Sequence, residues 1–166
     1  MKKKILFILF VIICIGSIIA CQVKPSNSSN FQQAIVEYVY DGDTIEVLID
    51  SQEIKVRMIG VDTPESVNED ETKNCEEGII ASDYTKSQLT EGKTIYLEYD
   101  EDLYDNYGRT LAYVWLSDDV NTNSFSDFKQ YNFGALLLQN TYCKAVYYAP
   151  NGKYKEWYEQ LDSHNY

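Results

Sequence analysis

Alternating apolar and polar residues predict three strands in the first half of the chain. Residues 35–40 are rich in β-forming residues, residues 44–50 place an aliphatic residue at every second position, and residues 53–58 repeat that alternation. Between the first two segments, Asp41-Gly42 is a strong hairpin-turn signal. Because strand side chains point alternately to two faces, Arg57 falls opposite the apolar face and is expected to point into solvent or a cleft.

Two more strands and three helices are predicted further along the chain. Strand-like composition recurs at residues 94–99 and 109–116, and helical spacing of apolar residues predicts helices over 79–89, from about Phe128, and from Tyr154 to Leu161. One helix thus lies between the third and fourth strands, and two follow the fifth. This order indicates an α+β domain: a five-stranded Greek-key β-barrel with three helices, the OB-fold among the candidates.

Two of these helices carry finer expectations. The weak periodicity of the helix at 79–89 rests on Ile80, Tyr84 and Leu89, which define its expected buried face. In the next helix, Asn140 follows the apolar repeat and suits a left-handed C-cap.

The N-terminus has the pattern of an export signal. Three lysines follow Met1 and precede the apolar run Ile5–Ala20, which is shorter than the roughly 20 residues that a membrane-spanning helix needs. The run ends in Ile18-Ile19-Ala20-Cys21, which resembles the processing site of bacterial lipoproteins.

We therefore expect residues 1–20 to be a signal peptide, Cys21 to be lipidated, residues 21–34 to form a flexible tether, and residues 35–166 to form the folded domain. The protein would then be lipid-anchored at the outer face of the cell membrane. A plain cleaved signal and an uncleaved anchor are the alternatives.

The charge of the chain limits how it could bind a polyanion. The formal net charge is -12 at pH 7, and removing three lysines with the signal would make it 11 minus 26, or -15. A broad basic surface for nucleic acid or anionic lipid is thereby excluded, so any anionic substrate must be captured locally. Only two of the 14 basic residues are arginines, Arg57 and Arg109, and both lie in short motifs beside Asp or Gly.

Few residues are available for histidine or thiolate chemistry. The only histidine is His164, which excludes a centre that needs several histidines. Beyond the signal and Cys21, two cysteines remain, Cys75 and Cys143. In an exported protein these two could form a disulfide or stay free, and the sequence leaves both possibilities open.

Three motifs together resemble the staphylococcal nuclease (thermonuclease) family over roughly residues 35 to 161. They are Tyr40-Asp41-Gly42-Asp43-Thr44, Arg57 followed by Val61-Asp62-Thr63-Pro64-Glu65, and Asp105-Asn106-Tyr107-Gly108-Arg109 with Leu111-Ala112-Tyr113. The resemblance implies an OB-fold nuclease.

The resemblance also implies a calcium site. Asp43 and Asp62 match the two carboxylate ligands of the family, and Thr63 matches the residue that supplies a backbone carbonyl. Calcium prefers such hard oxygen ligands. Asp41 would add negative charge near the ion without binding it.

The same resemblance assigns the catalytic groups. Glu65 matches the general base that takes a proton from the attacking water, and Arg57 and Arg109 match the arginines that clamp the phosphate. A planar guanidinium forms two parallel hydrogen bonds to phosphate, which lysine cannot do. Tyr107 and Tyr148 match aromatic residues that line the nucleotide pocket.

The sequence departs from the family pattern near that pocket. Asn106 stands where the staphylococcal enzyme has a lysine, which predicts weaker binding of a terminal phosphate. Val146 stands where another pocket tyrosine is frequent, and Tyr147 would replace it if the register shifted by one residue.

We therefore expect a monomeric calcium-dependent nuclease that acts on single-stranded or denatured DNA and RNA and leaves 3'-phosphates. Little base preference is expected because its contacts fall on phosphate and on stacked bases. The alternatives are a non-catalytic OB module that binds single-stranded nucleic acid or a protein partner, and an acidic calcium-binding surface protein. Neither alternative needs the two arginines.

Overall fold

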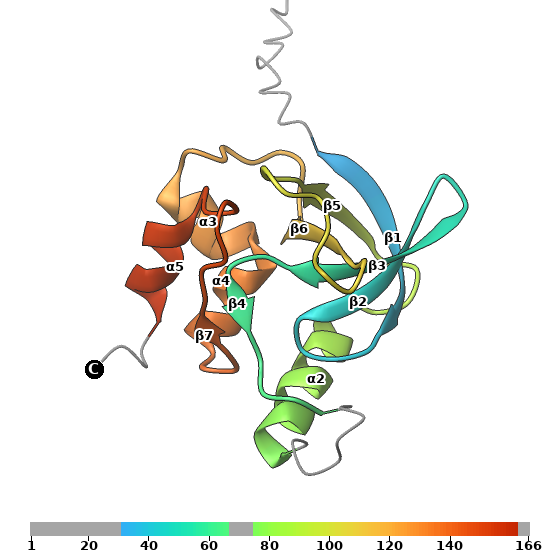
Figure 1. The fold of residues 1–166 in the computed structure, drawn as a ribbon, viewed down its shortest axis with the longest axis horizontal. Coiled ribbons are helices and arrows are strands. Elements are labelled where there is room, and N and C mark those ends of the chain that lie inside the picture. The colour runs from blue at the N-terminus through green and yellow to red at the C-terminus, as the bar shows by residue number, and fades with distance from the viewer. Residues whose placement is uncertain (1–30, 67–74, 163–166) are drawn as a thin grey trace, which may run out of the picture.

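A closed five-stranded barrel forms the body of the protein. The computed structural model describes residues 31–66 and 75–162. The strands follow the order β1-β2-β3-β6-β5 around the barrel, and β1 pairs with β5 to close it (Figure 1). All neighbours are antiparallel except β3 and β6. The barrel strands are β1 (Gln32–Val39), β2 (Thr44–Ile49), β3 (Gln52–Met58), β5 (Thr94–Glu98) and β6 (Thr110–Trp115). The predicted α+β barrel architecture is confirmed.

The barrel interior is filled by the residues that the alternation selects. Val36, Ile45, Val47, Val56 and Leu97 are fully buried. Burying each such side chain stabilises the fold by about 1.5–3 kcal/mol. The polar residues between them face outward, so the strand pattern both builds the core and orients the remaining side chains.

Four helices lie outside the barrel in the described part of the chain, one more than predicted. In Figure 1, α3, α4 and α5 lie on one side of the barrel and α2 lies below it. The helices are α2 (Glu76–Gln88), α3 (Phe125–Tyr131), α4 (Phe133–Gln139) and α5 (Lys155–Leu161).

The extra helix arises because the predicted single helix near Phe128 is broken. Asn132 has extended backbone angles, φ -79° and ψ 121°, and so ends α3 and begins α4. Its side-chain oxygen accepts a hydrogen bond from the Ala135 N–H at 3.0 Å, which caps α4. An apolar repeat continues through this residue, which is why periodicity alone predicted one helix.

The predicted left-handed C-cap at Asn140 is wrong. Asn140 has φ -98° and ψ 6°, and the left-handed residue is Thr141, with φ 61°. The Asn140 side chain instead donates to the Leu136 carbonyl at 2.8 Å. The left-handed residue that follows the helix therefore comes one position later than expected.

The predicted buried face of α2 is also wrong in part. Ile80 is 47% exposed, and the buried residues of the helix are small: Gly78, Ala81, Ser82 and Thr85. Larger side chains would hold the helix away from the loops that it covers.

A short two-stranded sheet joins the barrel to the helices. In it, β4 (Val61–Asp62) pairs antiparallel with β7 (Lys144–Ala145), which places Asp62 opposite Lys144. Just before β4, Gly60 has φ +89° and packs against the ring of Tyr158, where a side chain would clash. The strand therefore leaves the barrel directly over the aromatic core of the helices.

A buried carboxylate fixes the segment that leads into α5. Glu98 is 8% exposed, accepts hydrogen bonds from Trp115 Nε1 at 2.9 Å and from the Tyr154 hydroxyl at 2.8 Å, and pairs with Lys153. A buried charge is tolerated when it is paired and hydrogen-bonded in this way. The network holds the chain before α5 against β5 and β6.

The expected signal peptide, the Cys21 lipid site and most of the tether lie outside the described residues. Within the described ranges, no helix has the length and hydropathy to cross a bilayer.

Candidate active site

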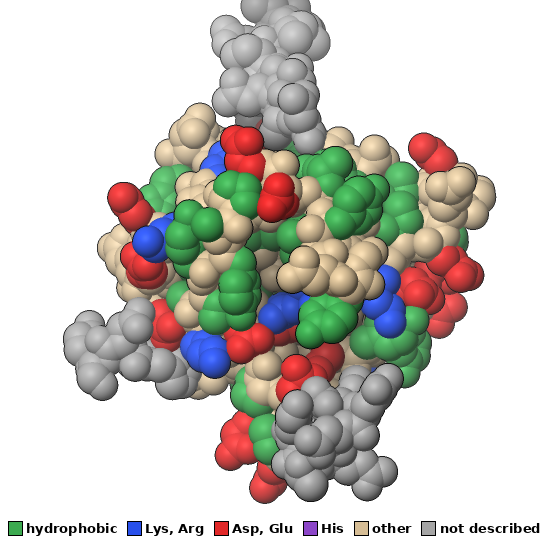
Figure 2. All heavy atoms as spheres, viewed as in Figure 1, with side chains coloured by type: hydrophobic (Ala, Val, Ile, Leu, Met, Phe, Trp, Pro, Cys, Tyr) green, Lys and Arg blue, Asp and Glu red, His purple; other side chains and the backbone are tan. Residues whose placement is uncertain are grey.

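A cleft of about 500 Å³ opens at one end of the barrel, and most of the predicted site residues line it. It is bounded by the turn between β1 and β2, the end of β3, the loop before β6 and the segment after β7. On the face drawn in Figure 2, Lys and Arg side chains in the middle of the molecule adjoin Asp and Glu side chains. The predicted residues on its walls are Asp43, Arg57, Asp62, Glu65, Tyr107, Arg109 and Tyr148.

Arg57 links the two carboxylates that were predicted to bind calcium. Its Nη1 lies 2.7 Å from Asp43 Oδ2, and its Nη2 lies 2.8 Å from Asp62 Oδ1. Nη1 also donates to the Val61 carbonyl at 3.0 Å. The β2–β3 register pairs Arg57 with Thr44, the neighbour of Asp43, which brings the guanidinium to this position. A lysine ammonium lacks the two separated nitrogens that reach both carboxylates.

Asp43 is the most buried carboxylate of the cleft. It is 5% exposed, and its Oδ2 accepts hydrogen bonds from Thr63 N–H at 2.7 Å and Thr63 Oγ1 at 3.0 Å. Burial raises the pKa of Asp43, while the Arg57 guanidinium and the hydrogen bonds from Thr63 oppose that rise. A positive charge beside Asp43 therefore favours its ionised form.

The donor chemistry of this corner fits a hard cation. The carboxylates of Asp41, Asp43 and Asp62 line one cleft and offer only oxygen atoms, the ligands that calcium prefers. In the described part of the chain, however, no three acidic, histidine or cysteine side chains are grouped as a ready metal site. Thr63 turns its N–H and hydroxyl toward Asp43. Calcium binding by Asp43, Asp62 and Thr63 thus stays a prediction.

Asp41 has a structural role that the sequence did not show. Its Oδ1 accepts hydrogen bonds from Gly42 N–H and from Ser66 Oγ, both at 2.8 Å. It therefore ties the β1–β2 turn to the loop that follows Glu65. Because Ser66 is distant in sequence and lies outside the motifs, no local signal pointed to this contact.

Glu65 lies on the rim of the cleft, on the loop after β4. The residue is exposed and lines the cleft. Its backbone carbonyl accepts a hydrogen bond from Cys75 N–H at 3.1 Å, at the start of α2. Glu65 is thus exposed while its backbone is fixed to the start of α2, which suits the expected general base, because that base must reach water.

Arg109 is held by a carboxylate four residues before it. Asp105 Oδ2 lies 2.6 Å from Arg109 Nε, and Asp105 Oδ1 accepts the N–H groups of Tyr107 and Arg109, each at 2.9 Å. Burial alone would raise the pKa of Asp105, but these hydrogen bonds outweigh it and lower the pKa. Gly108, with φ +78°, allows the tight loop.

Asn151 connects the two loops that carry the pocket tyrosines. It is 5% exposed, its Oδ1 accepts from Asp102 N–H at 2.7 Å, and its Nδ2 donates to the Asp102 carbonyl at 2.9 Å. Asn151 also forms a bridge with Tyr148, while Asp102 lies on the loop that leads to Tyr107. No local sequence signal indicated this clamp, because Asn151 and Asp102 are 49 residues apart.

The pocket side chains lie largely as the sequence indicated. Tyr107 and Tyr148 line the cleft and are 86% and 71% exposed, and Asn106 and Val146 line it as well. The ring of Tyr147 instead lies 4.6 Å from the Lys155 ammonium. Val146 therefore keeps its place in the cleft and is not replaced by its neighbour.

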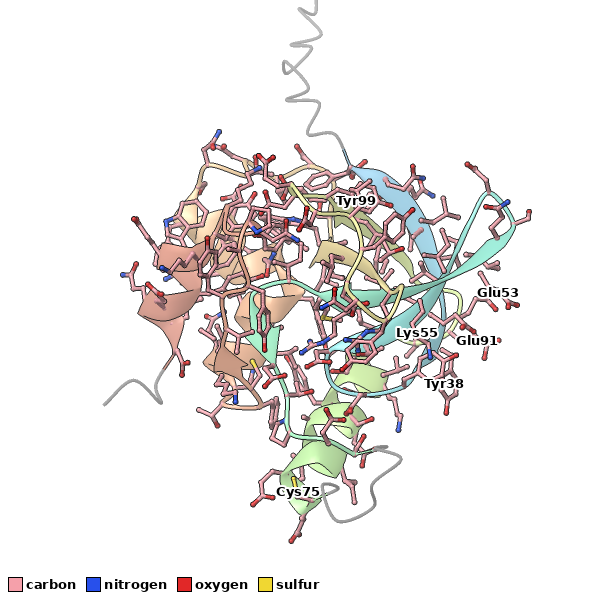
Figure 3. The ribbon with its side chains drawn as sticks, in the orientation of Figure 1. Tyr38, Glu53, Lys55, Cys75, Glu91 and Tyr99 are labelled. Atoms are coloured by element: carbon pink, nitrogen blue, oxygen red, sulfur yellow. The ribbon has the colours of Figure 1, made fainter. Side chains whose placement is uncertain are left out.

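The two cysteines in the described part of the chain do not line this cleft. Cys75 lies at the start of α2 (Figure 3), Cys143 is buried, and both are free thiols in this structure. Burial, and then nearby carboxylates led by Asp43, raise the pKa of Cys143. Its thiol therefore stays protonated at neutral pH.

Comparisons with known proteins agree with the geometry of this cleft. Residues 55–165 match the family model described as "Staphylococcal nuclease homologue". The chain is 40% identical over 137 residues to a thermonuclease of Staphylococcus intermedius, covering 82% of this chain and 73% of the relative. It is 42% identical over 134 residues to a thermonuclease of Staphylococcus hyicus, covering 81% and 71%. It is also 35% identical over 111 residues to an uncharacterized endonuclease of Escherichia coli, covering 61% and 66%.

Proposed function

Because the chain belongs to the staphylococcal nuclease family, we propose that it is a calcium-dependent nuclease that hydrolyses phosphodiester bonds in DNA and RNA. The observation that carries the proposal is that one cleft holds both arginines of the chain together with Glu65 and the buried carboxylates of Asp41 and Asp43. Thermonuclease relatives along most of the chain support the same class of reaction.

The chain's own residues supply the acid-base and electrostatic parts of hydrolysis. Glu65 takes a proton from the attacking water, because it is a carboxylate on the open rim of the cleft. Arg57 and Arg109 bind the phosphate and stabilise the negative charge that grows on its oxygens in the transition state. Tyr107 and Tyr148 offer exposed rings on which a base can stack.

Asp43 and Asp62 would hold calcium together with Thr63. Calcium bound there would act as a Lewis acid on the phosphoryl oxygen and would offset the negative charge of the two carboxylates, which pair with Arg57 in this structure. Water attack that displaces the 5'-oxygen leaves 3'-phosphate products. Since the catalytic contacts fall on phosphate, the enzyme should show little base preference.

The location of the enzyme is part of the proposal. The signal pattern of residues 1–20 and the motif at Cys21 support export and lipid anchoring at the outer face of the membrane. A monomer suffices, because a single chain supplies every proposed catalytic residue.

The decisive test is release of acid-soluble nucleotides from denatured DNA by residues 22–166. We expect cleavage with calcium and none with chelator. Glu65→Gln should lower the cleavage rate by about 10² to 10⁴-fold, the range that a positioned base contributes. Calcium-dependent thermal stabilisation without any cleavage would instead support a calcium-binding protein. Binding of single strands without cleavage would support a non-catalytic OB module.

A further inference from the structure

We propose that Gly78 and Thr85 are positioning residues through which helix α2 sets the spacing between the general base Glu65 and the Asp41–Asp43 turn. The inference rests on the proposed nuclease function of this cleft. Its evidence is two contacts that one face of α2 makes with the backbone of the Glu65 loop and of the β1–β2 turn.

The first contact fixes the loop of Glu65. Gly78 packs so closely on this loop that a Cβ atom there would overlap the Glu65 carbonyl and lie 2.8 Å from the Pro64 carbonyl oxygen. Three residues earlier, Cys75 N–H donates to that same Glu65 carbonyl at 3.1 Å. Glycine is among the poorest helix formers, so intrinsic helix propensity does not explain a glycine in the first turn of α2. The close approach of the loop does.

The second contact fixes the β1–β2 turn. Thr85 is fully buried, and its hydroxyl donates to the Gly42 carbonyl at 2.8 Å. Gly42 in turn lies against Thr63, where a Cβ atom would come within 2.6 Å of the Thr63 methyl carbon. The turn that carries Asp43 is therefore held between α2 and the residue after Asp62.

The rest of this helix face supports the same reading. Its buried residues are small, whereas the large apolar side chains Ile79 and Ile80 are 53% and 47% exposed. A helix that served mainly to cover the core would bury its large apolar residues. This one buries small residues, which lets the backbone of two catalytic segments come close.

The two contacts are seven residues apart and lie on one face of a continuous helix. At a rise of 1.5 Å per residue, that separation is about 10 Å. A rigid helix of this length therefore fixes how far Glu65 lies from the turn that holds Asp43. Misplacing a catalytic group by about 1 Å can cost on the order of 10²-fold in rate.

The experiment compares two substitutions in the full chain, in detergent and at a temperature where every variant is folded. Gly78→Ala forces the Glu65 loop away from the helix, so we expect kcat to fall about 10²-fold. The calcium concentration for half-maximal activity should stay unchanged. The Cys75 amide should exchange hydrogen faster, since its bond to the Glu65 carbonyl is weakened.

Thr85→Val keeps the shape of the side chain but removes the hydroxyl that holds Gly42. We expect calcium affinity, measured by calorimetry, to fall about 10-fold, as is typical when the support of a metal ligand is lost. Thr85→Ser retains the hydroxyl and should therefore bind calcium with the affinity of the wild type. Lys86→Gly, at an exposed position of the same helix outside the span between the two contacts, is the control: it should lower thermal stability and leave kcat and calcium affinity unchanged.

Two results would overturn the inference: unchanged kcat and an unchanged exchange rate of the Cys75 amide in Gly78→Ala, or losses of kcat and calcium affinity in Lys86→Gly that match those of the other variants. If the wild-type chain cleaves no nucleic acid, the proposed function fails. The exchange and calorimetry measurements then still show whether α2 holds the two segments.

Discussion

The two arginines of the cleft have very different surroundings. Arg57 lies on a barrel strand, its side chain is 13% exposed, and it bridges two carboxylates and a backbone carbonyl. Arg109 follows a loop, is 29% exposed and pairs with a single carboxylate, Asp105. One guanidinium is thus built into the fold, and the other is held mainly by its own loop. Replacing Arg57 should therefore lower the stability of the fold much more than replacing Arg109, although both arginines are proposed to bind the same phosphate.

Arg57→Ala should have the largest effect, because it harms both stability and activity. Removing one partner of a mostly buried ion pair leaves Asp43 uncompensated, which costs about 3–5 kcal/mol. Urea unfolding of the variant measures this loss. Adding Asp43→Asn should recover part of the stability and none of the activity. A loss below about 1 kcal/mol would show that Arg57 is no more integrated than Arg109.

Arg109→Ala should reduce activity strongly and leave the fold intact. The loss of one transition-state donor typically costs about 10²–10³-fold in kcat. The partly exposed pair with Asp105 should contribute about 1 kcal/mol or less to stability, well below the contribution of the buried Arg57–Asp43 pair. Steady-state kinetics and urea unfolding on the same preparation test both parts. A large loss of stability would contradict the proposed contrast between Arg109 and Arg57.

Asn151→Ala should act more weakly and on substrate binding. It leaves the N–H and carbonyl of Asp102 without their partner, which costs about 1–3 kcal/mol if they stay out of water. The loop that carries Tyr107 should loosen, so KM should rise more than kcat falls. Asn121→Ala, in an exposed loop, is the control. Equal effects of the two substitutions would argue against a specific clamp at Asn151.

Acid should produce the smallest effect, confined to the Arg109 loop. The pKa of Asp105 is lowered in the folded state, so its stabilising contribution is complete above the unfolded pKa of about 3.9 and is lost as the pH falls through the lower folded value. The stability difference between the wild type and Asp105→Asn should therefore shrink as the pH drops from 5 toward 2. A difference that does not change with pH would contradict the assignment.

The sequence predicted what depends on neighbouring residues. Alternation located the barrel strands and placed Arg57 away from the apolar core, and ordered motifs identified Asp43, Glu65 and Arg109 as residues of one site. Each of these signals spans only a few residues. The inward or outward direction of a strand residue follows from parity alone.

What the sequence did not predict depends on distant contacts. The Asn151 clamp, the Asp41–Ser66 bond and the β4–β7 pairing join residues that are far apart in the chain. The break at Asn132 lies inside an uninterrupted apolar repeat, and the buried face of α2 is set by the loops it packs on. Periodicity records which side of an element is apolar, and it does not record which element covers that side.

The parallel pairing of β3 with β6 has a consequence for how the chain folds. It sets Val56 beside Thr110 and Arg57 beside Leu111, and so brings together two segments that are more than 50 residues apart. Contacts of such long range form only after much chain entropy has been lost. Arg57 and Arg109 therefore come together only when the barrel is nearly complete. A growing or half-folded chain should have no cleft and should not cleave nucleic acid.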